Sequence, residues 1–159
     1  MRTILIALLT VLSMNSIALE GSFIKKGSKL GVGLKAHSLE IQMLNGSNSY
    51  QEKNLLYSPD FNIYSLGKFD LLVNPSLGIS QRTVTINKKR DVCLDNPNNT
   101  VSNNCYEQKD LSSTKIMQGL GAKINYQLNR DQGINIGVTN SYFGGKQEQH
   151  FAIGFTVSF

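Results

Sequence analysis

The chain has 159 residues, of which 40% are apolar and 17% charged, with 14 Gly and 3 Pro. This length allows one domain at most, and the composition excludes a collagen-like or disordered chain. Two Cys, two His and no Trp leave few residues for metal or redox chemistry. The net charge of +5 comes from scattered basic residues without an aromatic–basic motif. We therefore expect no cofactor and no nucleic-acid partner.

Residues 1–18 have the three parts of a secretory signal peptide. Arg2 supplies the positive charge, residues 4–12 are almost wholly apolar, and small residues lie at the two positions that signal peptidase reads. The apolar stretch is shorter than the roughly 20 residues that a membrane helix needs. We expect cleavage after Ala18 and one domain over residues 19–159. The alternative is a buried amphipathic first helix.

Six later segments alternate between apolar and polar side chains with a period of two. Such alternation is typical of a strand with two different faces. The segments are residues 29–36, 55–64, 69–80, 115–128, 133–141 and 150–159. After the signal, no helical periodicity exceeds two turns. The sequence therefore predicts an all-β domain.

The alternation changes phase after His37, so that Leu39 and Ile41 are out of step with the strand before them. A β-bulge near His37 would change the phase without ending the strand, and a separate short strand would do so as well. Both interpretations stay open. Two weaker candidate strands, residues 21–26 and 39–44, would raise the number from six to eight.

The connections between these segments alternate in length. Gly67–Lys68 and residues 129–131 are tight turns made of turn-forming residues. The connections over residues 45–54, 87–113 and 144–149 are polar, and the first two are longer. Short turns at one end and longer loops at the other are typical of an up-and-down membrane barrel.

The charges favour a membrane barrel over a soluble β-domain. The apolar face has no charge over its core length, whereas the polar face has charges of both signs within the strands. We expect a polar network in the barrel lumen, formed by Lys35, Asp60, Asp70, Arg82, Lys115 and Lys123. The alternative is a soluble periplasmic or secreted β-barrel that binds a small ligand in its interior.

Cys93 and Cys105 both lie in the polar segment 87–113. In an oxidising compartment, an even pair in a short segment predicts a disulfide. The loop that it closes would contribute roughly 3 kcal/mol in the chain-entropy account. A metal site or a redox pair is the alternative.

The same segment begins with a basic cluster of Lys88, Lys89 and Arg90. Clustered cations raise the local concentration of anions. The cluster is therefore a candidate contact for the phosphates of lipopolysaccharide or for anionic host polymers. The alternative is the solvated base of a loop.

The final segment, residues 150–159, reads HFAIGFTVSF. It resembles the terminal strand of bacterial outer-membrane barrels, in which the last residue is typically Phe. The resemblance implies that the barrel-assembly machinery recognises this strand. Its apolar face consists of Phe151, Ile153, Phe155, Val157 and Phe159. Residues 55–80 and 118–159 resemble strands of the small opacity- and OmpX-like barrels. The resemblance implies an antiparallel up-and-down transmembrane β-barrel of eight strands in the outer membrane of a Gram-negative bacterium.

Because only six strands are clear, three outcomes remain open: a degenerate N-terminal pair, an unusually narrow barrel, or closure by a second copy. A lipid-modifying barrel enzyme would need a nucleophile and a base within hydrogen-bond reach. His37 and Ser38 are strand neighbours that point to opposite faces, and nothing in the sequence fixes the geometry of Ser141 and His150.

We therefore expect no enzymatic activity and little conduction. The expected role is structural or one of surface interaction, with a disulfide-closed extracellular loop over residues 87–113. The expected partners are outer-membrane lipids, lipopolysaccharide and the barrel-assembly machinery. A surface ligand is not identified by the sequence.

Overall fold

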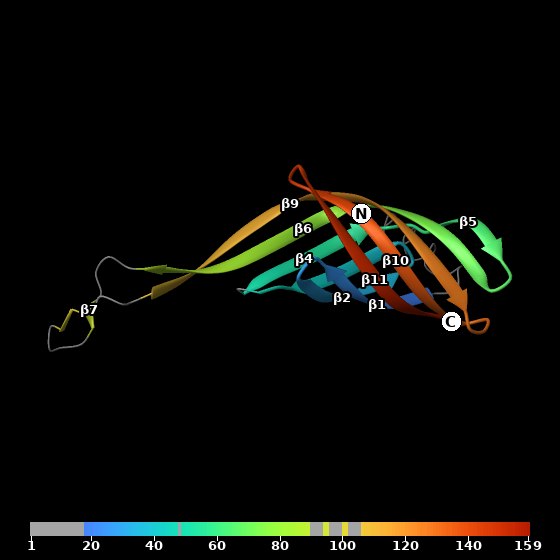
Figure 1. Cartoon of the computed structure of the whole chain (residues 1–159), viewed down its shortest axis with the longest axis horizontal. Coiled ribbons are helices and arrows are strands. Elements are labelled where there is room, and N and C mark those ends of the chain that lie inside the picture. The colour runs from blue at the N-terminus through green and yellow to red at the C-terminus, as the bar shows by residue number, and fades with distance from the viewer. Residues whose placement is uncertain (1–17, 48, 90–93, 96–99, 102–105) are drawn as a thin grey trace, which may run out of the picture.

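The computed structural model describes residues 18–47, 49–89, 94–95, 100–101 and 106–159 (Figure 1). These residues form the following strands: β1 (Ala18–Lys26), β2 (Lys29–Ala36), β3 (Leu39–Asn45), β4 (Tyr50–Tyr57), β5 (Phe61–Leu66), β6 (Phe69–Lys89), β7 (Leu94–Asp95), β8 (Thr100–Val101), β9 (Tyr106–Gln127), β10 (Gln132–Phe143) and β11 (Lys146–Ser158). In this part of the chain, no helix is long and apolar enough to cross a membrane.

The strands close into an antiparallel barrel. Nine strands form one sheet in the order β4-β3-β2-β1-β11-β10-β9-β6-β5, and an additional pairing of β4 with β6 closes it. The first and last strands of the wall are neighbours, because β1 pairs with β11 over Ala18–Lys25 and Phe151–Ser158. Strands β7 and β8 pair only with each other. Closure within a single chain removes the narrow barrel and the two-copy barrel from the three predicted outcomes.

Strands β4 and β5 share one position in the wall, so that the nine strands of the sheet fill eight positions. Both pair with β6, and the register of β4 continues into the first two residues of β5 before it shifts between Asn62 and Tyr64. Between them, this register places Pro59 opposite Pro75. Proline has no backbone N–H, so neither residue can donate to the ladder. The eight-stranded barrel predicted from the resemblance is therefore confirmed, with a break in one strand.

The apolar faces point away from the barrel axis, as the sequence predicts. The side chains of Phe23 and Phe151 are 77% and 55% exposed, whereas those of Glu52 and Lys123 are buried. Further apolar side chains exposed on the outer wall are Leu34, Ile41, Leu77, Leu120, Ile136, Ile153 and Phe155. A soluble sandwich or carrier would bury this set. The barrel instead places polar side chains inside, as a bilayer-spanning wall requires.

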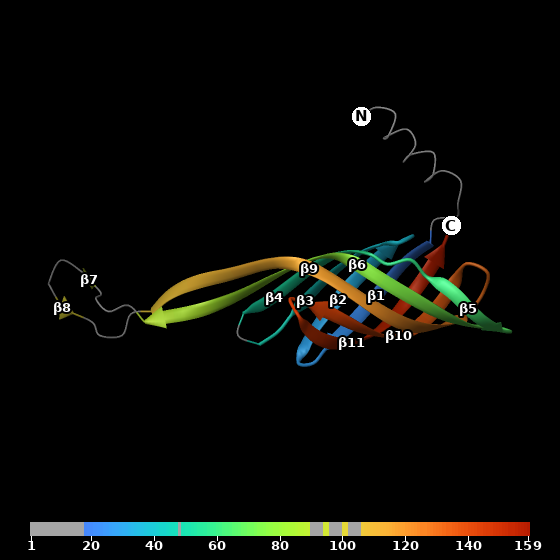
Figure 2. The same ribbon diagram turned by 90° about the horizontal axis from the view of Figure 1, so that it is seen from above.

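The two ends of the barrel differ (Figure 2). At one end, β6 and β9 continue far beyond the other strands as a two-stranded hairpin, pairing as far as Lys89 and Tyr106. Strand β10 reaches only to Met117 of β9. The β5–β6 turn, the β9–β10 turn and the C-terminus lie at the opposite end (Figures 1 and 2).

The structure resolves the phase change that the sequence left open. His37 and Ser38 form a turn between β2 and β3, with φ of 55° at His37. The second strand is therefore separate, and no bulge is needed. The predicted weak strands 21–26 and 39–44 both exist, as parts of β1 and β3.

The three connections predicted as polar loops are shorter than expected, because strands extend into them. Strand β4 begins at Tyr50, β6 ends at Lys89, β9 begins at Tyr106 and β11 begins at Lys146. Beyond a bilayer, both faces of a strand meet polar surroundings, so the alternation in hydropathy is lost while the ladder continues. Residues 1–17, which hold most of the predicted signal peptide, lie outside the described residues; cleavage remains a prediction.

We predict that Gly78→Ala destabilises the barrel. A Cβ at Gly78 would lie 2.0 Å from the backbone oxygen of Leu55 and 2.8 Å from Cα of Leu56, so the backbone of β4 would have to move. Overpacking of this kind costs about 1–3 kcal/mol. Urea unfolding in lipid vesicles measures the change. The matched control is Gly21→Ala, whose added Cβ would meet nothing within 4 Å; an equal loss in both variants would contradict the steric explanation.

Candidate functional site

The interior near the hairpin end holds an ion-pair cluster, which we call the Glu52 cluster. It consists of Lys26, Glu52, Arg82 and Glu148. Lys26 Nζ lies 2.7 Å from Glu52 Oε1 and 2.8 Å from Glu148 Oε2. Arg82 Nε lies 3.3 Å from Glu52 Oε2. The Nη1 and Nη2 atoms of Arg82 donate hydrogen bonds to the two carboxylate oxygens of Glu148. Each cation therefore bridges the same two carboxylates.

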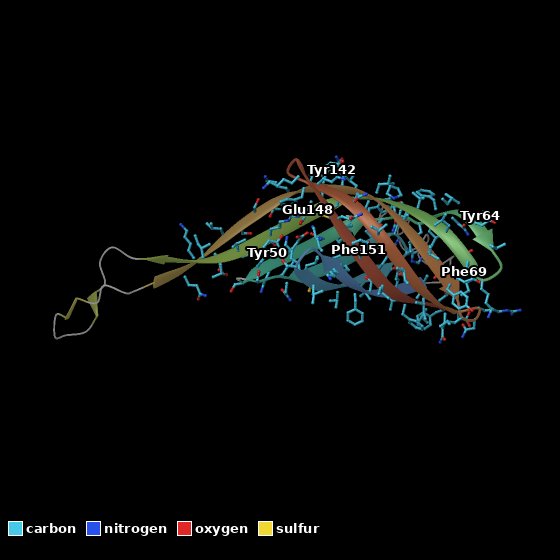
Figure 3. All side chains as sticks on the ribbon, in the orientation of Figure 1. Tyr50, Tyr64, Phe69, Tyr142, Glu148 and Phe151 are labelled. Atoms are coloured by element: carbon cyan, nitrogen blue, oxygen red, sulfur yellow. The ribbon has the colours of Figure 1, made fainter. Side chains whose placement is uncertain are left out.

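Two residues at the lumen mouth add to this cluster. The hydroxyl of Tyr50 donates a hydrogen bond to Glu52 Oε2 at 2.7 Å. Lys29 Nζ lies 3.8 Å from the same oxygen and 3.8 Å above the ring of Tyr50. Tyr50 and Glu148 enter the cluster from different strands, β4 and β11 (Figure 3). The cluster thus connects strands of the wall that are distant in sequence.

A second cluster, the Asp60 cluster, fills the interior toward the other end. Lys123 Nζ lies 2.7 Å from Glu20 Oε2 and 2.8 Å from Asp60 Oδ2, and Lys35 Nζ lies 2.7 Å from Asp60 Oδ1. Two cations and two carboxylates therefore compensate each other. Such pairing offsets much of the cost of removing charges from water.

Hydrogen bonds between amide side chains run from the Glu52 cluster toward the Asp60 cluster. Asn54 donates to Glu52 at 3.2 Å and to Gln42 at 3.0 Å, and Gln42 donates to Glu40 at 2.7 Å. Asn54, Gln42 and Glu52 are buried. The interior is therefore a connected polar core, not an apolar pocket.

Little space remains between the clusters. The central cavity has a volume of about 40 Å³ and is lined in part by Ser22, Gln42, Asn135 and His150. A larger space of about 190 Å³ opens at the mouth beside the Asp60 cluster. Small-molecule sites usually measure about 300–1,000 Å³ and are mostly apolar. The central cavity has room for water, and it does not suit an organic ligand.

Four of the six side chains expected in the lumen network take part in these clusters: Lys35, Asp60, Arg82 and Lys123. Asp70 does not, because it lies near the β5–β6 turn and accepts hydrogen bonds there from Ser65 and Gln127. Lys115 is exposed at the hairpin end, with its Nζ 5.8 Å from the ring of Phe143. Both lie at the ends of the wall, beyond the enclosed part of the lumen.

Four members of these clusters were not predicted from the sequence: the carboxylates Glu20, Glu52 and Glu148 and the cation Lys26. Glu52 and Glu148 fell in segments interpreted as loops. The available signal was parity: Glu148 is two residues from His150, and Glu52 is two residues from Asn54, both of which face inward. Extending the alternation past the last apolar residue would have found them.

The described residues contain neither a serine hydrogen-bonded to a histidine at the candidate pair nor a metal-ligand group. Ser141 and His150 are both buried, but Ser141 Oγ donates to the backbone oxygen of Glu148 at 3.3 Å. Nδ1 of His150 has no hydrogen-bond partner. Within the described ranges, no group of three or more His, Cys, Asp or Glu side chains is placed to hold a metal ion.

Aromatic side chains gather on the outer wall at the end opposite the hairpin. Tyr64 and Phe69 lie there (Figure 3), and the rings of Phe69 and Tyr126 have centroids 4.8 Å apart. Aromatic residues at this level of a barrel are typical of a membrane–water interface. This end therefore has the outer surface expected at one edge of a bilayer.

The remaining predicted sites differ in how far the structure describes them. Phe151, Ile153, Phe155 and Phe159 of the C-terminal segment are exposed on the outer wall, and Val157 is half-buried. Lys88 and Lys89 belong to the end of β6. Cys93, Cys105 and Arg90 lie outside the described residues, so the disulfide remains a prediction.

Known proteins resemble this chain in fold and not in sequence. No family model and no curated protein matches it. Among solved structures, the N-terminal β-barrel domain of Pseudomonas aeruginosa OprF matches with a TM-score of 0.54 and 14% identity, over 91% of this chain and 98% of that one. Neisserial surface protein A (NspA) matches with a TM-score of 0.54 and 12% identity, over 91% and 96%. The chain has the fold of these small barrels.

We predict that Glu52→Gln destabilises the barrel by about 3 kcal/mol, because the substitution removes the fully buried one of the two carboxylates that Lys26 and Arg82 share. The midpoint of urea unfolding in vesicles measures the effect. The control is Asp70→Asn, which removes a carboxylate near the β5–β6 turn, outside both ion-pair clusters, and should change stability by less than about 0.5 kcal/mol. Equal stability of Glu52→Gln and the wild type would show that the cluster contributes nothing.

Proposed function

We propose that this chain is a small outer-membrane β-barrel protein of a Gram-negative bacterium with a structural or surface-interaction role. The single observation that carries the proposal is the closed wall, apolar outside and ion-paired inside. Such a wall is stable in a bilayer, where every backbone polar group must be satisfied within the protein. Export by a cleaved signal peptide and contact with outer-membrane lipids and lipopolysaccharide complete this proposal.

The barrel-assembly machinery is the proposed partner during biogenesis. Strand β11 supports this role, because its apolar residues lie on the outer wall and the strand pairs with β1 to close the barrel.

The surface-interaction role is supported by the projecting β6–β9 hairpin. Beyond Met117, β9 pairs with β6 alone, so the described residues of β9 have an unpaired backbone edge there. Cross-strand hydrogen bonds from Gln81 to Ser112 and from Thr85 to Asp110 hold the hairpin. An unpaired edge with polar side chains can bind an extended segment of a partner. We propose that this hairpin, with a disulfide-closed tip, faces the cell exterior.

The alternative, a soluble barrel that carries a small ligand, has less support. Its outer wall would expose an apolar belt to water. The central cavity of about 40 Å³ is too small for an organic ligand. The same filled interior argues against a pore, because the two ion-pair clusters occupy the lumen at different levels.

Protease treatment of intact cells tests the proposed location and orientation together. We expect cleavage within residues 87–113 and survival of the barrel, because this segment would lie outside and the wall within the membrane. Mass spectrometry of the surviving fragments identifies the cleavage site.

Folded wild-type protein should also migrate differently on a detergent gel before and after boiling.

The control is a periplasmic marker protein, which must remain intact while the cells are sealed. Cleavage only after lysis would reverse the proposed orientation. Recovery in the soluble fraction, with no mobility difference on boiling, would instead support the ligand-carrying alternative.

The proposed disulfide has its own test. Alkylation of the unfolded chain without reductant should add no adduct, and alkylation after reduction should add two, at Cys93 and Cys105. Intact mass measures both. The double variant Cys93→Ser/Cys105→Ser controls for side reactions and should gain no adduct under either condition. Two adducts without reductant would refute the disulfide.

A further inference from the structure

Where all eight positions of the wall are filled, the outward charges have a single sign. Between the β5–β6 turn and the level of Met117, at which β10 ends, the described charged side chains that face outward are Lys25 and Lys53, and both lie near the hairpin end. The carboxylates of this part of the wall are on the inward-facing side of their strands: Glu20, Glu40, Glu52, Asp70 and Glu148. Asp110 is exposed farther along the projecting hairpin, where it accepts a hydrogen bond from Thr85. The belt around Lys25 is therefore cationic without a compensating acid.

Lys25 adjoins an apolar groove on the outer wall. The groove runs across β11, β1 and β2, has a volume of about 300 Å³ and is lined by Phe23, Leu30, Phe151 and Ile153 beside Lys25. The register places Lys25 in one row with Phe151 and Leu30, and places Phe23 in the next row, farther from the β1–β2 turn. The cation therefore lies at the end of the groove nearest the hairpin end.

We propose that this groove binds a phosphorylated acyl glycolipid of the outer leaflet, of the lipid A class. An acyl chain lies against Phe23 and Ile153, and the Lys25 ammonium donates hydrogen bonds to the phosphate. This inference rests on the proposed function, in which the hairpin end faces the outer leaflet.

Two features make this occupant fit better than a neutral lipid. A groove open to hydrocarbon accepts an acyl chain, since its lining is almost wholly apolar. A single cation at the headgroup end, with no outward carboxylate nearby, selects a negatively charged headgroup through a charge-assisted hydrogen bond. Phe23 is the most exposed apolar side chain of this groove, at 77%, so its ring is free to contact the chain.

Lys53 provides a matched comparison. It is also an outward cation near the hairpin end, but its neighbours in the register are Met43 and Gln81 and it does not line the groove. Substitution of Lys53 therefore removes the same charge from the same belt without touching the proposed site.

Native mass spectrometry of the full mature chain in detergent, titrated with bisphosphorylated hexa-acyl lipid A, tests the proposal. Lys25→Gln should weaken binding about fivefold, which corresponds to about 1 kcal/mol. Lys25→Arg and Lys53→Gln should stay within about twofold of the wild type. Dephosphorylated lipid A should bind wild type and Lys25→Gln equally.

Each variant is first checked for the mobility difference on boiling, so that loss of folding is not mistaken for loss of binding. If Lys53→Gln weakened lipid A binding as much as Lys25→Gln, general attraction between charges would explain the binding without a specific site, and the proposal would be overturned. Wild-type binding of phosphatidylglycerol as strong as that of lipid A would overturn the glycolipid assignment. Unchanged binding by Lys25→Gln in a protein recovered from the outer membrane overturns this site alone, whereas a soluble wild type overturns the proposed function.

Discussion

Pairing between β1 and β11 is the constraint on which the rest of this structure depends. Eight residues of each strand pair in register and join the two ends of the sheet. A bilayer contains no water to satisfy backbone N–H and C=O groups, so an open sheet could not span it. Once the sheet is closed, each side chain has only two environments. The outward apolar belt and the inward ion pairs both follow from that division.

How much of this fold the sequence predicts depends on what each strand meets on its two faces. Strands in the middle of the wall have apolar side chains on the outer face and polar or ion-paired side chains on the inner face, so their alternation is clear. The alternation in the first strand, β1, is less clear because its outer face contains Gly21 and Lys25 beside the apolar residues. The turn at His37–Ser38 stayed one of two open interpretations for another reason: His37 adopts a positive φ without being Gly or Asn, so its conformation is not marked by its residue type.

The interior was predicted in part, and the gaps have one physical origin. Lys35, Asp60, Arg82 and Lys123 lie close enough to apolar neighbours for alternation to reveal them. Glu52 and Glu148 lie where the outer face has become polar, through Gln51 beside one and Gln149 beside the other. Hydropathy alternates only where the outer face of the wall is apolar, although the ladder itself continues. Near the ends of the strands, the partners of buried charges therefore cannot be identified from alternation in hydropathy.

The opposed prolines Pro59 and Pro75 have a mechanical consequence. Neither offers a backbone N–H, so neither can donate to the ladder across this gap. Strand β6 still pairs with β9 along its whole length, from Phe69 to Lys89. Strand β5 is attached to the sheet through β6 alone. Separation of β5 from β6 would therefore leave the closed ladder of the remaining strands intact, including the β4–β6 and β6–β9 pairings.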